Sequence, residues 1–139
     1  MTNRILLSLF IISLFASCSS SGKLTSDSNS QRLIFGNGGG FTGIYTTYEL
    51  FEDGNVFILL PDNTFQPLKK IRKKKARELF SQADKLKIAQ PEFNHPGNMT
   101  WFITIQANGM ITEYKWGDAN NSVPNEIEDL YDQLNTIVK

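Results

Sequence analysis

Two segments of the chain alternate between apolar and polar positions with the period of two that is typical of β-strands. They are residues 44–60 and 101–116, and each is interrupted by a dipeptide that favours a two-residue hairpin turn, Asp53-Gly54 or Asn108-Gly109. We therefore predict two β-hairpins. The predicted partners are Glu52 with Asn55, Leu50 with Phe57 and Tyr48 with Leu59 in the first hairpin, and Ala107 with Met110, Ile105 with Thr112, Ile103 with Tyr114 and Trp101 with Trp116 in the second. The first register places Phe57 and Leu59 in the core.

Two other segments carry apolar residues at helical spacing. These residues are Ala76, Leu79, Phe80, Ala83 and Leu86 in the first segment, and Val123, Ile127, Leu130, Tyr131, Leu134, Ile137 and Val138 in the second. We predict amphipathic helices over residues 72–87 and from Asn125 onward. Asn125 and Glu128 have the spacing of a capping box, and acidic residues occupy the first turns of this helix, where the helix dipole favours them.

The remaining pattern predicts short strands at residues 33–35 and 65–71, with Pro67 limiting the latter to a sheet edge, and a loop over residues 88–99. Together these elements predict an α+β fold: a single antiparallel sheet of about four to six strands with both amphipathic helices on one face. The two helices share the same apolar steps and each follows a hairpin, which suggests a possible hairpin–helix duplication.

Residues 1–18 have the three parts of an export signal. Arg4 provides the basic start, and Ile5–Phe15 is an uncharged apolar run that is too short to span a bilayer. Ala16 and Ser17 provide small residues just before Cys18, where a signal would be cut. The protein is therefore expected to be exported.

The segment from Leu14 to Cys18 resembles the lipobox of bacterial lipoproteins, although Phe15 stands where the family more often has Leu. The resemblance implies that the signal is cut before Cys18, that the Cys18 sulfur carries diacylglycerol, and that the new amino group is acylated. Two or more acyl chains hold a protein stably on a membrane. Cys18 is the only cysteine, so an internal disulfide is excluded.

These features divide the chain into a signal peptide (1–17), a lipidated cysteine with a flexible Ser-rich tether (18–31) and a globular domain (32–139). An Asp directly after the cysteine would resemble the inner-membrane retention signal of lipoproteins. Ser19 stands there instead, so we expect the outer membrane. In Bacteroidetes-like lipoproteins, surface export is associated with acidic residues near the cysteine. The first acidic residue here is Asp27, so a resemblance to them implies the periplasmic face, with the cell surface as the alternative.

The overall charge is balanced, with 14 Lys and Arg against 14 Asp and Glu, and it favours neither nucleic acid nor bulk electrostatic binding to membranes. The basic residues are nevertheless clustered. Half of them are Lys69, Lys70, Arg72, Lys73, Lys74, Lys75 and Arg77. Cations at the start of a helix oppose its dipole. The cluster is either a solvated face or a site for lipid phosphates, an acidic polysaccharide or an acidic partner.

A glycine-rich segment, Gly36–Gly43, contains the letters of a G-x-G-x-x-G motif at Gly38, Gly40 and Gly43. A strand pattern follows instead of the helix that a dinucleotide site requires, so we reject that function. The glycines either form a turn or bulge, or Gly38, Gly39 and Gly40 line a rim where a ligand or partner approaches the backbone.

The paired Trp101 and Trp116 suit a hydrophobic core or staple, with a platform for a sugar or lipid as the alternative. No catalytic constellation is visible. His95 is the only histidine and lacks a nucleophile-elbow motif, and the chain has too few ligands for zinc. We expect no metal, no cofactor and no enzymatic activity.

The strings FGNGGGFTG, FNHPGN and KWG resemble pieces of small uncharacterised lipoproteins of Bacteroidetes-like bacteria, a resemblance that covers most of Phe35–Gly117 and implies no activity. We predict a non-catalytic, membrane-anchored envelope lipoprotein that binds a protein partner through a sheet edge or the glycine-rich rim. The alternative is a binding module for an anionic glycan or lipid that uses the basic cluster, and a weak enzyme is less favoured.

Overall fold

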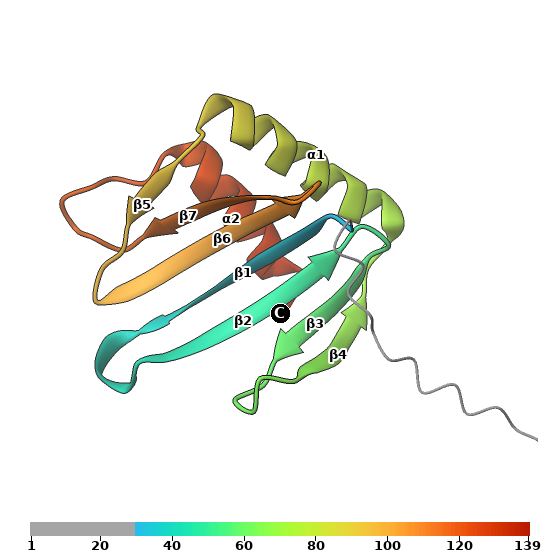
Figure 1. Ribbon diagram of the computed structural model, residues 1–139, viewed down its shortest axis with the longest axis horizontal. Coiled ribbons are helices and arrows are strands. Elements are labelled where there is room, and N and C mark those ends of the chain that lie inside the picture. The colour runs from blue at the N-terminus through green and yellow to red at the C-terminus, as the bar shows by residue number, and fades with distance from the viewer. Residues whose placement is uncertain (1–29) are drawn as a thin grey trace, which may run out of the picture.

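The computed structural model of the protein describes residues 30–139, so the predicted signal peptide, Cys18 and most of the tether lie outside the described residues. Figure 1 shows the elements in chain order. They are β1 (Arg32–Gly39), the short 3₁₀ helix η1 (Gly40–Thr42), β2 (Ile44–Phe51), β3 (Asn55–Leu59), β4 (Phe65–Lys70), α1 (Lys73–Ala89), β5 (Phe93–His95), β6 (Met99–Ala107), β7 (Met110–Trp116) and α2 (Asn125–Thr136).

The strands form one seven-stranded sheet in the order β4-β3-β2-β1-β6-β7-β5. Neighbours are antiparallel except β5, which runs parallel to β7. The α+β class is confirmed, but the prediction of four to six strands in an antiparallel sheet is wrong. The predicted loop over residues 88–99 contains β5. β5 and β7 can run parallel because β6, which is antiparallel to β7, lies between them in the chain.

β1 lies at the centre of the sheet because it pairs with β2 on one side and β6 on the other. Leu33 and Phe35 on this strand are buried against the helices at 0% and 1% exposure. The strand continues through Gly39, well past the predicted end at residue 35. It therefore joins the two predicted hairpins into a single sheet.

The register of the second hairpin is confirmed, including the pairing of Trp101 with Trp116. The register of the first hairpin is wrong by one residue, because Leu50 pairs with Val56 and Glu49 with Phe57. The loop has three residues rather than two: the Gly54 amide donates to the Phe51 carbonyl, and Gly54 has the positive φ of 89° that such a loop requires. Phe57 therefore leaves the helix-covered face and Val56 takes its place.

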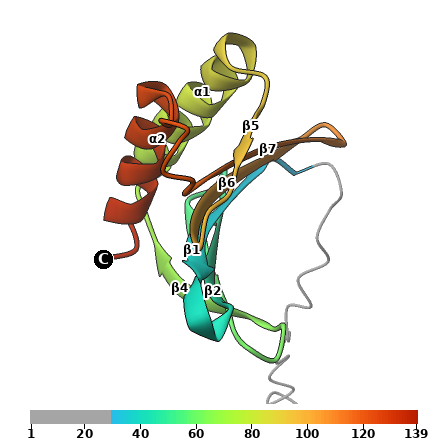
Figure 2. The same ribbon diagram turned by 90° about the vertical axis from the view of Figure 1, so that its left-hand side faces the viewer.

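Both helices cover the same face of the sheet, as Figure 2 shows. Between the helices and the strands lies one core, in which Leu79, Leu130 and Ile103 are almost fully buried. Gln133 of α2 exchanges hydrogen bonds with Gln82 of α1 at 2.9 and 3.2 Å, which fixes the two helices side by side. No helix within residues 30–139 combines the length and the apolar character needed to cross a bilayer.

The helix ends differ from the prediction. α2 starts after Pro124, and no side chain caps it, so the predicted capping box of Asn125 and Glu128 is wrong. Pro124 occupies the N-cap position, and its carbonyl accepts the first hydrogen bonds of the helix, from the amides of Ile127 and Glu128. The predicted duplication is also imperfect, because β4 lies between the first hairpin and α1 and has no counterpart before α2.

Candidate functional site

The sheet has an open face that is turned away from both helices (Figure 2). Side chains alternate along a strand, and Leu33 and Phe35 point to the helices. The residues that alternate with them on β1, and the residues paired with those on β2 and β6, therefore point to the open face. Its central members are Arg32, Ile34, Gly36 and Gly38 of β1, Tyr45, Thr47 and Glu49 of β2, Thr100, Phe102, Thr104 and Gln106 of β6, and Glu113 and Lys115 of β7. Unlike the core face, the open face is rich in hydroxyls and charges.

A shallow pocket of about 460 Å³ lies on the open face over β1, β2, β6 and β7. Its lining consists of Tyr45, Thr47, Pro96, Thr100, Phe102, Thr104, Glu113 and Lys115. The lining mixes two aromatic rings, four hydroxyls and one charge of each sign. Lys115 and Glu113 form an ion pair at 2.9 Å, so the pocket wall is close to neutral.

Gly36 and Gly38 of β1 lie beneath this pocket, and neither has a positive φ. Glycine is needed at both positions because a side chain there would overlap atoms of β2. A Cβ at Gly36 would overlap the Thr46 carbonyl and come within 3.1 Å of the Phe102 ring, and one at Gly38 would lie 2.6 Å from the Tyr45 ring. The rings of Tyr45 and Phe102, with centroids 6.1 Å apart, thus occupy the space that side chains on β1 would fill.

The predicted rim of Gly38, Gly39 and Gly40 is divided between a strand and a turn. Gly38 lies inside β1, Gly39 ends it and Gly40 begins η1, with φ values of 105° and 67° at Gly39 and Gly40. Exposed apolar side chains surround this turn: Phe41 is fully exposed, Ile44 is 68% exposed and Met99 is 39% exposed. We call Gly38, Gly39 and Gly40 with these three apolar residues the glycine-rich end.

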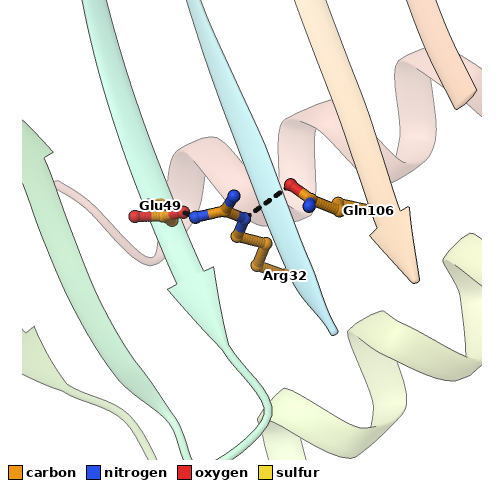
Figure 3. A network of polar contacts seen from close by, with 3 residues as sticks. All are labelled: Arg32, Glu49 and Gln106. Carbon is orange, nitrogen blue, oxygen red and sulfur yellow. Dashed lines mark hydrogen bonds and ion pairs between the residues drawn. The ribbon is translucent and has the colours of Figure 1, made fainter. Parts of the chain in front are cut away.

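A buried polar network crosses three strands of the open face (Figure 3). Arg32 Nη1 donates to Glu49 Oε1 at 2.8 Å, and Arg32 Nε donates to Gln106 Oε1 at 2.7 Å. The Glu49 side chain is only 3% exposed. Burial raises the pKa of Glu49, and the charge and hydrogen bond of Arg32 partly oppose this rise. Because Glu49 is engaged by Arg32, the network ties β1, β2 and β6 together.

Sequence analysis missed this network and the pocket. Glu49 stands between Tyr48 and Leu50, which the sequence places on the core face, so alternation along the strand already puts Glu49 on the opposite face. Nothing local indicates that it is buried there. No local signal links Arg32 to Gln106, which are 74 residues apart. The pocket likewise depends on pairings between distant strands.

The structure brings the whole basic cluster together at the outer edge of the sheet. Lys69 and Lys70 end β4, Arg72 precedes α1, and the other members lie in the first turns of α1. All are exposed except Lys75, which is half-buried and donates to Gln133 Oε1 at 3.1 Å. The cluster is joined to the first hairpin because the Ile71 amide donates to the Gly54 carbonyl at 2.9 Å.

The two tryptophans belong to the helix-covered side. Trp116 is 7% exposed and meets the Tyr131 ring edge-on, with centroids 5.1 Å apart. Trp101 is half-buried and packs against the core. Nearby, the buried Tyr114 hydroxyl donates to the Gln90 carbonyl at 2.8 Å, and burial raises the pKa of Tyr114 to about 12. These positions match the core interpretation rather than a ligand platform.

His95 is exposed on β5, where its ring contacts Phe93 with centroids 4.8 Å apart. In residues 30–139 no three His, Cys, Asp or Glu side chains are grouped as metal ligands would be. No protein-family model matches the chain, and no curated protein matches it in sequence.

Proposed function

We propose that the protein is a non-catalytic envelope lipoprotein that binds a protein partner on the open face of its sheet. Acylation of Cys18 would hold it on the outer membrane, and the periplasmic face is favoured by the residues after the cysteine. The observation that carries the binding function is the pocket of about 460 Å³ above Gly36 and Gly38. It lies beside the exposed apolar glycine-rich end.

The lining favours a segment of a protein over a polyanion. Tyr45 and Phe102 provide aromatic surface, which is enriched where proteins bind one another, and the threonine hydroxyls can pair with backbone groups. The ion-paired Lys115 and Glu113 add no net charge. A protein segment fits this lining if its apolar side chain contacts the two rings and its backbone bonds to the threonine hydroxyls.

The edges of the sheet are less suited to a partner. β4 contains Pro67, which has no amide hydrogen, and its register shifts between Val56 and Phe57, which leaves Leu68 as a bulge. β5, at the other edge, has only three residues. A partner strand would find few regular hydrogen-bonding groups on either edge, which supports the open face as the docking surface.

A photo-crosslinking experiment tests the docking surface. Tyr45 is replaced by p-benzoylphenylalanine in the full chain expressed in a bacterial envelope, and Thr46, its exposed neighbour on the other side of β2, is replaced in a matched control. We expect a discrete adduct with one protein from position 45 and none from position 46. The adduct should disappear when Thr104→Arg fills the pocket of a chain that still unfolds cooperatively.

Equal adducts from positions 45 and 46, or an adduct that survives Thr104→Arg, would contradict docking on the open face. Anchoring is measured separately by the intact mass of the natively expressed protein. An unmodified thiol at Cys18 would contradict the lipoprotein part of the proposal and leave the crosslinking result unaffected.

A further inference from the structure

Six cations form what we call the basic surface: Lys69, Lys70, Arg72, Lys73, Lys74 and Arg77. Lys75 is left out because it bonds to Gln133. Within residues 30–139 the ion pairs involve other residues, joining Arg32 to Glu49, Lys87 to Asp84 and Lys115 to Glu113. The six side chains are exposed and have no carboxylate partner there, so their charge is directed to solvent.

The acidic residues at the start of α2 lie beside the end of α1. Gln133 of α2 lies beside Lys75 and Gln82 of α1, whereas the acidic Glu126 and Asp129 line a depression with Leu86 and Ala89, near the end of α1. The helices are therefore antiparallel, and the acidic first turn of α2 lies near the end of α1 rather than its start. The positive end of the α1 dipole adds to the basic surface.

The described chain begins next to the basic surface. Ser30 and Gln31 line a depression together with Asp53 and Asn55, and Asn55 pairs with Lys70 of β4. Residues 19–31 separate this point from Cys18, and thirteen residues of chain span at most about 45 Å. A lipid on Cys18 would thus keep the basic surface close to the bilayer.

We propose that the basic surface docks on the anionic phospholipid headgroups of the bilayer that holds the anchor. This inference rests on the lipid anchor of the proposed function. Lysines and arginines next to a membrane bind anionic headgroups, and Leu68, which is 41% exposed beside Lys69, adds apolar surface for the interface. The start of the chain at this same end favours a bilayer over a soluble polysaccharide.

Docking would also orient the domain. β1 runs from Arg32, near the basic surface, to Gly39 at the glycine-rich end, as the course of the strands in Figure 1 shows. Eight residues of strand span roughly 25 Å. With the basic surface on the headgroups, the glycine-rich end and the adjoining pocket point away from the membrane, toward a partner.

Vesicle binding of the full chain carrying Cys18→Ser tests this docking without acylation. Binding is measured on phosphatidylcholine vesicles with and without phosphatidylglycerol, at low and physiological salt. Two double variants on the same helix carry the same change of charge: Lys73→Ser with Lys74→Ser at its start, and Lys85→Ser with Lys87→Ser near its end. The apolar leader is identical in all chains, and its contribution is given by the phosphatidylcholine vesicles.

We expect phosphatidylglycerol to strengthen binding, salt to weaken it, and the 73/74 variant to bind about tenfold more weakly than the 85/87 variant. Equal losses in the two variants, or no preference for phosphatidylglycerol, would overturn the proposal. Binding to heparin without binding to phosphatidylglycerol would assign the surface to an anionic polysaccharide and would also overturn it. Because Cys18 is replaced, failure here is distinct from failure of acylation, which the intact mass of the native protein reports.

Discussion

The two helices bury the same apolar pattern but differ in the charges of their first turns. α2 begins after Pro124 and carries Glu126 and Glu128 in its first turn, where they complement the helix dipole. α1 begins with three consecutive lysines, Lys73–Lys75, and neither helix has a side-chain cap. Since α1 forms despite cations at its positive end, burial of its apolar stripe must outweigh its unfavourable start.

This difference teaches where a functional constraint is to be sought. In most of the chain, local preference and tertiary structure agree, as in α2. At the start of α1 they disagree, and neutral residues at Lys73 and Lys74 would stabilise the helix without disturbing the core. The start of α1 is therefore the place in the helix layer where we look for the role proposed above for the basic surface.

The largest effect is expected where the helices are alike. Leu79 of α1 and Leu130 of α2 are 0% and 2% exposed in the same core. Leu79→Ala and Leu130→Ala should each lower the free energy of unfolding by about 2–5 kcal/mol, because each leaves a cavity. Denaturant unfolding measures both. If Leu79→Ala, unlike Leu130→Ala, lowered the free energy of unfolding by only a small amount, burial of the apolar stripe would not be what stabilises α1.

A smaller effect of opposite sign is expected where the helices differ. Lys73→Gln with Lys74→Gln should raise the free energy of unfolding, whereas Glu126→Gln with Glu128→Gln should lower it, by about 0.3–1 kcal/mol per side chain. The same unfolding assay at low salt measures both variants, and high salt should shrink both changes. If both pairs of substitutions changed stability in the same direction, the helix dipole would not explain the contrast.

The smallest effect is expected for Glu49, whose negative charge is opposed by burial rather than by a helix dipole. Burial raises the pKa of Glu49 above its ordinary value of 4.5, so the folded state favours the protonated carboxyl. The stability that this provides is present below pH 4.5 and is lost as the pH rises through the raised pKa. Glu49→Gln removes this titration and leaves an oxygen that can accept from Arg32.

Unfolding of the wild type and of Glu49→Gln is therefore to be compared from acidic to neutral pH. The wild type should lose stability relative to Glu49→Gln as the pH rises, and the other carboxylates cancel in the difference. A difference that stays constant, or that changes in the opposite direction, would show that Arg32 compensates fully for the burial of Glu49.

The parts of the fold that sequence predicts are those fixed by neighbours in the chain. The helical stripes and the Asn108-Gly109 turn are local signals, and both helices and the second hairpin were placed correctly. The first hairpin was wrong because Asp53-Gly54 fits a two-residue turn as well as the three-residue loop that forms. A shift of one residue moves every later side chain to the other face, which is why Phe57 was misplaced.

The candidate site was the harder part to predict, because its members meet only through long-range pairing. The sequence singles out Gly38, Gly39 and Gly40 for their backbone freedom, but glycine is required at Gly36 and Gly38 because the β2 backbone approaches closely, with the rings of Phe102 and Tyr45 next to it. Phe102 reaches Gly36 only because β6 pairs with β1. The basic cluster lies within nine consecutive residues, so a local pattern in the sequence is enough to predict it.

The bulge at Leu68 and the neighbouring Pro67 have a consequence for copies of the chain that the proposed anchor would hold on a bilayer. Tethered molecules on a bilayer meet one another far more often than molecules in bulk solution, and exposed sheet margins could then zip together into fibrils. A margin interrupted at Pro67 and flanked by like-charged lysines resists such growth. Copies held side by side by the proposed anchor would thus be hindered from joining through this edge.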